Sequence, residues 1–191
     1  MAILKVARMG HPVLRQKARA IESREFRTVP LQRLIDDLIE TMHEYSGVGL
    51  AAPQVHESVR LFVAQIDVAG RGEGDPIVVA NPEIAVLNDQ LVQGWEGCLS
   101  MPDLRGMVPR AAEIKVSGLD RTGKRIEMPV KGFPARVVQH ETDHLNGVLF
   151  VDRMRSFETL TFMEEFSRYH ARSDEDEDED GTEDEDTAAA S

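Results

Sequence analysis

Residues 139–147 read QHETDHLNG and place two histidines four positions apart. On a helix, residues at this spacing lie on the same face, one turn apart. Two imidazoles arranged in this way can share one metal ion, and Glu141, next to His140, can reach a water molecule on that ion. Pro134 fits the first turn of such a helix, and Gly147 can end it in the left-handed conformation. The stretch therefore predicts a metal-binding helix with His140 and His144 as ligands, provided that a third ligand comes from elsewhere.

Three placements of that third ligand can be compared, because catalytic metal sites usually take three protein ligands and leave one position for water. In metzincins a third histidine follows six residues after the second, but that position is Phe150, which cannot bind a metal. Glu164 and Glu165 lie at a distance that suits a thermolysin-like peptidase. Cys98 lies in a glycine-rich stretch, and its thiolate is a good ligand for zinc or ferrous iron. Spacing alone leaves the glutamates and the cysteine open.

The length of 191 residues is typical of one domain with a substantial core. No apolar run approaches the ~18 residues that a membrane span requires. The first residues do not resemble a secretory signal or a transit peptide, so we expect the protein in the cytoplasm. With one cysteine, the chain cannot form an intramolecular disulfide.

The formal net charge of −12 belongs almost entirely to the end of the chain. Residues 174–186 contain eleven acidic side chains and no basic ones, which leaves 23 acidic against 22 basic residues in the rest. Such a block repels itself and buries little apolar surface, so residues 172–191 are predicted to be a disordered tail after a catalytic domain at 1–171. The sequence contains no concentrated basic patch of the kind that would indicate a nucleic-acid site.

The remaining pattern predicts an α+β fold with antiparallel β-sheet around a central helix that carries the two histidines. Apolar residues at helical spacing predict a core helix over residues 26–45. A second helix is expected at 157–170, a turn-rich segment at 94–102 and a hairpin turn at 120–123. Strands are expected at residues 59–66, 76–87, 114–119 and 125–130, with a loop at 70–75.

Three motifs together resemble the peptide deformylase family in order and approximate spacing: GVGLAAPQ at 47–54, EGCLS at 96–100 and QHETDHLNG at 139–147. The resemblance extends over about residues 3–155 and includes HPVLR near the start. It implies a hydrolase that removes the formyl group from the N-terminal formylmethionine of newly synthesised proteins. It also implies N-formylmethionyl nascent peptides as substrates and transient contact with the ribosome, although the acidic tail should oppose approach to rRNA.

The same resemblance implies roles for individual residues. Cys98, His140 and His144 would bind one divalent metal ion, with Fe(2+) expected as the native ion and Zn(2+) as an alternative. Glu141 would be the catalytic acid and base. The side chain of Gln54 and the backbone N–H of Leu99 would stabilise the oxyanion, and Gly49 and Arg105 would contact the substrate peptide.

Several polar residues are candidates for orienting the ligands, because a ligating histidine normally donates its other N–H. These candidates are Asp143, Gln139 and Glu96, the last of which can instead pair with Arg110. Phe133 and Arg136 are expected near the pocket for the methionine side chain, with the tip of Arg136 facing solvent. The other histidines, His11, His43, His56 and His170, have no partner at ligand spacing and are interpreted as structural or surface residues.

Three competing functions make different predictions. A zinc endopeptidase would use Glu164 or Glu165 and would keep its metal without Cys98. A cysteine hydrolase with Cys98 as nucleophile would be insensitive to chelators. A binding module that acts through its acidic tail would hold no stoichiometric metal and release no formate.

Overall fold

The computed structural model describes residues 2–67 and 76–171. The predicted loop at 70–75 and the predicted acidic tail at 172–191 lie outside these residues, and the division into a catalytic domain and a tail therefore stays a prediction. Among the residues described, no helix is both long and apolar enough to cross a membrane.

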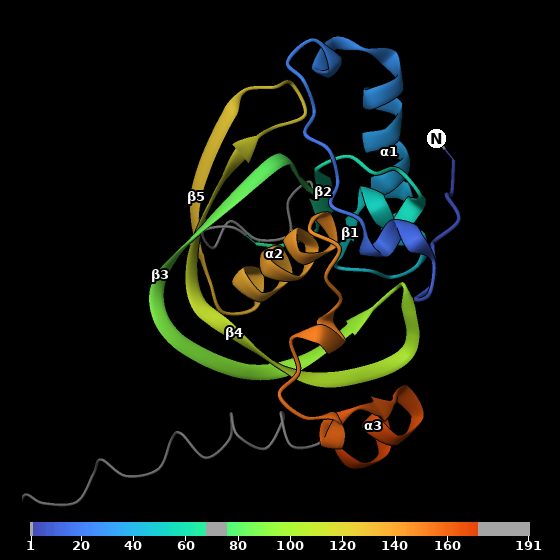
Figure 1. The fold of residues 1–191 in the computed structure, drawn as a ribbon, viewed down its shortest axis with the longest axis vertical. Coiled ribbons are helices and arrows are strands. Elements are labelled where there is room, and N and C mark those ends of the chain that lie inside the picture. Colours follow the sequence, from blue (N-terminus) through green and yellow to red (C-terminus); the bar gives the residue numbers. More distant parts are fainter. Residues whose placement is uncertain (1, 68–75, 172–191) are drawn as a thin grey trace, which may run out of the picture.

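The core of the fold is an antiparallel sheet whose strands are neighbours in chain order. These strands are β1 (Gly49–Ala51), β2 (Leu61–Ala64), β3 (Ile77–Cys98), β4 (Met101–Leu119) and β5 (Arg125–Lys131), and β6 (Thr161–Phe162) pairs with β4. The pairing of β3 with β4 is interrupted by several register shifts. Such bulges bend a strand, and Figure 1 shows β3, β4 and β5 curving around a central helix. The predicted α+β fold is confirmed.

The central helix is α2 (Gly132–Leu145), which follows β5 directly and has Pro134 in its first turn. At its end, Gly147 adopts a positive φ of 73°. The amide of Val148 donates to the carbonyl of Asp143 at 3.0 Å, and the amide of Gly147 donates to the carbonyl of His144 at 3.2 Å. This pair of hydrogen bonds is a Schellman motif, so Gly147 ends the helix as predicted.

The predicted N-terminal helix is α1 (Val29–Glu44), and it begins after the short 3₁₀ turn η2 (Glu25–Arg27). Leu31, Ile35, Leu38 and Met42 are buried on one face, as the helical spacing predicts. They form one core cluster with residues of β1 and β2. A second cluster joins α2 to the other face of the sheet, through residues such as Val138 and Ile114.

The prediction of a turn-rich segment at 94–102 was wrong in extent. Strand β3 continues to Cys98, only Leu99 and Ser100 form a turn, and β4 begins at Met101. Gly94 lies within the strand because an arginine occupies the space beside it: a Cβ on Gly94 would lie 2.6 Å from Nη2 of Arg136. Glycine in a strand can mark such a close approach rather than a turn.

The prediction of a helix over 157–170 was also wrong in extent. Only α3 (Met163–Tyr169) is α-helical there, preceded by η5 (Phe157–Thr159) and β6. Residues 161 and 162 instead extend the sheet, since Thr161 pairs with Arg105 and Phe162 with Leu104. The remaining 3₁₀ turns are η1 (Pro12–Arg15), η3 (Ala52–Val55) and η4 (Phe150–Asp152).

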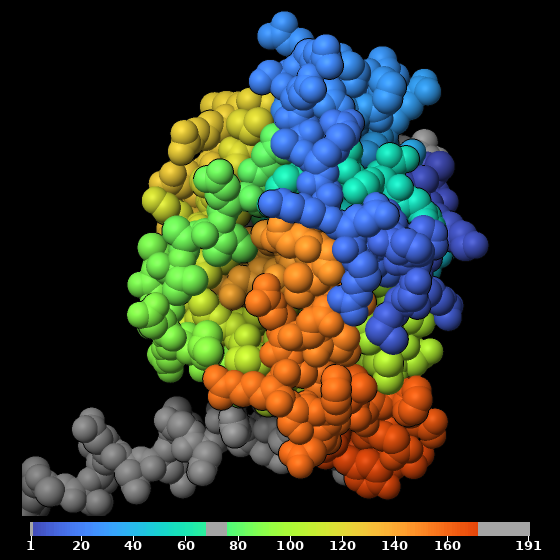
Figure 2. Space-filling view, viewed as in Figure 1, coloured from blue at the N-terminus to red at the C-terminus, as the bar shows by residue number. Residues whose placement is uncertain are grey.

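The N-terminal segment closes one side of the molecule. Figure 2 shows its blue surface beside the orange surface of the residues at and after the end of α2. The amide of Ala18 donates to the carbonyl of Leu145 at 2.9 Å, and the guanidinium of Arg15 pairs with Asp152 of η4. Segments from both ends of the described chain thus pack against the end of the motif helix.

Candidate metal centre and active site

Cys98, at the end of β3, faces His140 and His144 on α2. One ligand atom from each of the three residues lies within 4.8 Å of the other two, and Sγ of Cys98 is 3.3 Å from Nε2 of His144. The two imidazole rings have centroids 4.9 Å apart, as expected for residues four apart on a helix. All three side chains are buried. The three predicted ligands therefore converge.

The donors themselves suit a metal ion. Burial opposes ionisation of the Cys98 thiol, but the charge of His144 and hydrogen bonding to the two histidines outweigh it, so that the pKa of Cys98 lies well below its usual value. A thiolate with two imidazoles is a donor set for zinc or ferrous iron. Three protein donors also leave a fourth position open, as catalytic sites require.

Glu96, on β3, fixes the orientation of His140. Nδ1 of His140 donates to Oε2 of Glu96 at 2.9 Å, which leaves Nε2 as the nitrogen free to bind a metal. Burial opposes the charge on Glu96, but hydrogen bonds from His140 and Arg110 outweigh burial and lower its pKa to about 2. The sequence predicted that Glu96 either orients a ligand or pairs with Arg110. In the structure it makes both contacts.

Two arginines hold Glu96. Arg110 binds it through two hydrogen bonds of 2.9 and 3.0 Å, and Nη1 of Arg136 donates to Oε1 at 2.9 Å. Arg136 also donates to the backbone carbonyls of Val92, Gly94 and Val108. The side chain of Arg136 is only 11% exposed, so the prediction that its tip faces solvent was wrong. Because the guanidinium finds a carboxylate and three carbonyls inside the fold, its burial is compensated.

The other two candidates for orienting ligands do not contact a ligand atom. Asp143 binds Arg110 at 2.6 Å and Arg153 at 2.7 Å, so it supports Glu96 only through Arg110. Gln139 makes hydrogen bonds to both backbone groups of Ala111 and ties α2 to β4. Within the described residues, Nδ1 of His144 is buried without a hydrogen-bond partner.

Glu141 lies beside the three donors, opposite β1. Its side chain is buried, and Oε2 has no hydrogen-bond partner among the described residues. Burial raises the pKa of Glu141 to about 7, against the lowering effect of His140 and His144. A Cβ on Gly49 would lie 2.5 Å from Oε1 of Glu141, so glycine lets the β1 backbone approach this carboxylate.

Gln54, in η3, points its amide toward the cysteine. Nε2 of Gln54 donates to Sγ of Cys98 at 3.5 Å and to Oγ of Ser100 at 3.3 Å, while Oε1 accepts from the amide of Ala51 at 2.8 Å. The last contact fixes which end of the amide faces the site. Leu99, in the turn after Cys98, lines the same space.

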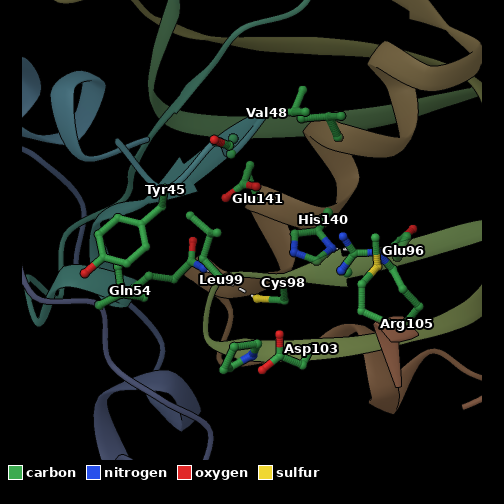
Figure 3. Close-up of a pocket in the computed structure, with 18 of the residues that line it drawn as sticks. Tyr45, Val48, Gln54, Glu96, Cys98, Leu99, Asp103, Arg105, His140 and Glu141 are labelled. Carbon is green, nitrogen blue, oxygen red and sulfur yellow. Dashed lines mark hydrogen bonds and ion pairs between the residues drawn. The ribbon is translucent and has the colours of Figure 1, made fainter. Parts of the chain in front are cut away.

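One cavity of about 680 Å³ is bordered by Gln54, Cys98, Leu99, His140 and Glu141. Figure 3 shows Glu141, His140 and Cys98 around a common space, with Leu99 next to Gln54. The predicted substrate contacts Gly49 and Arg105 line this cavity, as do Phe133 and Arg136. The structure therefore brings together the three expected metal ligands and the expected catalytic and substrate-contacting residues.

The alternative ligands do not join the cluster. The side chains of Glu164 and Glu165 are 77% and 45% exposed and pair with Arg168 on α3. Among the residues described, Cys98, His140 and His144 are the one group placed to share a metal ion. His11 packs edge-on against His56 and His170 packs near Trp95, as expected for structural residues.

Sequence reasoning missed the contact of Arg136 with Glu96, and it missed several residues that line the cavity, among them Lys5, Arg8 and Met163. None of them lies in a motif, and Lys5, Arg8 and Met163 reach the site from parts of the chain distant from the three motifs.

Comparison with known proteins agrees with this geometry. The model of the polypeptide deformylase family matches residues 3–159. A peptide deformylase 2 from Nostoc sp. is 44% identical over 162 residues, which is 81% of this chain and 87% of that protein. A class I type b peptide deformylase from Acinetobacter baumannii, in a structure bound to Met-Ala-Ser, has 42% sequence identity to this chain and a TM-score of 0.75. The match covers 80% of this chain and 99% of that one. A peptide deformylase from Thermotoga maritima gives a TM-score of 0.74 at 40% identity, covering 82% and 100%.

Proposed function

The chain belongs to the polypeptide deformylase family and is a metal-dependent hydrolase that removes the N-formyl group from N-terminal formylmethionine, and we propose that Cys98, His140 and His144 hold the metal of this reaction. The observation that carries the proposal is the convergence of one sulfur and two imidazoles from distant parts of the chain, with Sγ of Cys98 3.3 Å from Nε2 of His144. The chemistry that a divalent ion supplies at such donors is Lewis acidity, which makes water acidic enough to lose a proton near neutral pH.

Glu141 transfers the proton. Its buried Oε2 has no competing hydrogen bond among the described residues, and burial raises the pKa of this carboxyl, to about 7 in the metal-free fold, toward the range that suits both accepting and releasing a proton near neutral pH. The carboxylate accepts a proton as water attacks the formyl carbon. It then gives this proton to the amine nitrogen as the C–N bond breaks, which yields formate and a free amino terminus.

Gln54 and Leu99 stabilise the negative charge that develops on the formyl oxygen. The Gln54 amide is held by Ala51 with its Nε2 directed toward Cys98. The backbone N–H of Leu99, directly after Cys98, is the second donor. Removal of one such donor costs about 3 kcal/mol of transition-state stabilisation in other acyl-transfer enzymes.

The substrate is a formylmethionyl nascent peptide, which contacts Gly49 and Arg105 along the cavity. Two observations support this substrate: Gly49 and Arg105 line the cavity, and the Acinetobacter baumannii relative has a Met-Ala-Ser peptide bound. We propose that the protein acts on this substrate in the cytoplasm. Transient contact with the ribosome stays a prediction, which co-sedimentation of the chain with and without residues 172–191 would test.

Ferrous iron is proposed as the native ion and zinc as the alternative, because both accept a thiolate and two imidazoles. Metal analysis after anaerobic purification distinguishes them. Iron as native ion predicts stoichiometric iron and activity that falls on exposure to air.

Formate release from formyl-Met-Ala-Ser, measured on the full chain, tests the assignment of Glu141. We expect Glu141→Ala to lower kcat by at least about 100-fold, the usual contribution of a general acid and base. Metal content measured on the same samples separates this loss from loss of the ion. If Glu141→Ala retains both metal and full kcat, the proposed role of Glu141 is wrong.

A further inference from the structure

Two exposed cations of the N-terminal segment, Lys5 and Arg8, line the cavity that holds the metal donors. Their neighbours Val6 and Ala7 are buried, so the segment is packed against the fold while these two side chains remain at the mouth of the cavity. Arg105, from β4, lines the same cavity. These three residues are called the cationic rim.

Backbone hydrogen bonds fix the position of the rim. On one side of Lys5, the amide of Leu4 donates to Oγ1 of Thr41 at 2.9 Å. The amide of Ala7 donates to the carbonyl of Gln54 at 2.7 Å, and that of Met9 donates to the carbonyl of Ser100 at 2.8 Å. Lys5 and Arg8 are therefore held on either side of the attachment to Gln54, whose side chain faces Cys98.

Within the residues that the structure describes, no acidic side chain pairs with the rim. Within the described part of the chain, neither Lys5 nor Arg8 has a side-chain hydrogen bond or ion pair, and Arg105 donates only to the carbonyl of Leu104.

Carboxylates do line the cavity, but they offset the rim only in part. Glu96 is already bound by two arginines and Glu141 is buried, which leaves Asp103 as the exposed carboxylate of the lining. The mouth of the cavity thus carries an excess of positive charge, although the folded body of the protein is nearly neutral.

We propose that the cationic rim selects formylmethionyl peptides with acidic side chains at the positions that follow the methionine. This inference rests on the proposed function, because it requires the formyl group to be at the metal donors. The peptide beyond the methionine then has to leave through the mouth of the cavity, past Lys5 and Arg8. Carboxylates there gain attraction to unpaired cations that are already fixed in place, so the preference should lie in KM rather than in kcat.

The test compares two amidated peptides of equal length, formyl-Met-Ala-Ser-NH₂ and formyl-Met-Glu-Asp-NH₂, so that no terminal carboxylate contributes. The readout is the ratio of their kcat/KM values for formate release by the full chain. At ~20 mM salt we expect about a fivefold preference for the acidic peptide, the scale of a few exposed charge pairs. At 1 M salt the Debye length is about 3 Å and the preference should disappear.

Charge-reversal variants identify the residues responsible. Lys5→Glu/Arg8→Glu should make the ratio fall below one, and Lys5→Gln/Arg8→Gln should lower it toward one without adding negative charge. Lys17→Glu is the matched control, because Lys17 is exposed, unpaired among the described residues and outside the cavity lining. Its ratio should stay at the wild-type value.

The outcomes separate this inference from the proposed function. Equal kcat/KM for the two peptides, or a ratio that Lys17→Glu changes as much as Lys5→Glu/Arg8→Glu, overturns the selection by the rim. An unchanged ratio in Lys5→Glu/Arg8→Glu also overturns it, and weaker ribosome co-sedimentation of this variant would then assign the rim to RNA. Absence of formate release from both peptides contradicts the proposed function instead.

Discussion

Glu96 accepts a hydrogen bond of 2.9 Å from Nδ1 of His140 at Oε2, while Arg110 binds both carboxylate oxygens and Arg136 binds Oε1. A carboxylate on β3 thus determines which nitrogen of a histidine on α2 is free for metal binding. The arrangement keeps three charged groups buried, and it is tolerated because each of them is paired.

Replacement of Glu96 by glutamine should weaken metal binding. An amide cannot balance both arginines, and it orients the His140 ring less firmly. We expect metal affinity to fall about 10- to 100-fold, the usual effect of losing a group that orients a ligand. Competition with a chelator of known affinity measures this change. Glu57→Gln, at an exposed position outside the cavity lining, is the control and should leave metal affinity unchanged.

Replacement of Gly49 by alanine should reduce activity without unfolding the protein. The new Cβ would lie 2.5 Å from Oε1 of Glu141, so the carboxylate or strand β1 must move. Displacement of a proton-transfer group by about 1 Å can cost about 100-fold in rate. The expected result is a large loss of kcat with a Tm within a few degrees of wild type. Unchanged kcat would show that Glu141 does not need its present position.

The raised pKa of Glu141 predicts how the stability of the metal-free protein depends on pH. Its pKa is about 7 in the fold against 4.5 in the unfolded chain, so the folded state binds the proton more tightly. The favourable contribution of the protonated group is complete below about pH 4.5 and is lost as pH rises through 7.

Glu141→Gln should therefore stabilise the metal-free protein relative to wild type, and by more at pH 8 than at pH 5. The difference should be up to about 3 kcal/mol, on the scale of 1.36 kcal/mol per pKa unit. Urea denaturation of chelator-treated samples at the two pH values measures it. An equal effect at both values would mean that Glu141 titrates normally in the fold.

Arg136→Leu tests whether the buried guanidinium supports the fold as well as the site. The substitution removes an ion pair to Glu96 and leaves the carbonyls of Val92, Gly94 and Val108 without this donor. Breaking a buried pair from one side costs about 3 to 5 kcal/mol. Urea denaturation should show a loss of this size, whereas Arg33→Leu, at an exposed position of α1 that has no ion pair among the described residues, should change stability by less than about 0.5 kcal/mol.

The motif helix and its end were predictable because the signals are local. The i, i+4 spacing places His140 and His144 on one face, and Gly147 supplies the left-handed residue that the Schellman motif requires. The third ligand was not predictable from spacing, since Cys98 and Glu164 were both compatible with it. Only the resemblance of three motifs to a known family selected Cys98.

The errors have a physical cause in contacts between distant residues. Gly94 and Gly97 read as turn residues, yet they lie in a strand because Arg136 and Arg105 fill the space where side chains would be. The direction of Arg136 depends on Glu96, forty residues earlier in the chain. No local pattern encodes such a contact.

The metal content of Cys98→Ala after anaerobic purification tests the central assignment most directly. With its sulfur donor removed, the variant should retain far less than one metal ion per chain and release no formate from formyl-Met-Ala-Ser. The double variant Glu164→Ala/Glu165→Ala is the matched control and should keep both metal and activity. A Cys98→Ala protein that holds one ion per chain, together with a glutamate variant that holds none, would contradict the account.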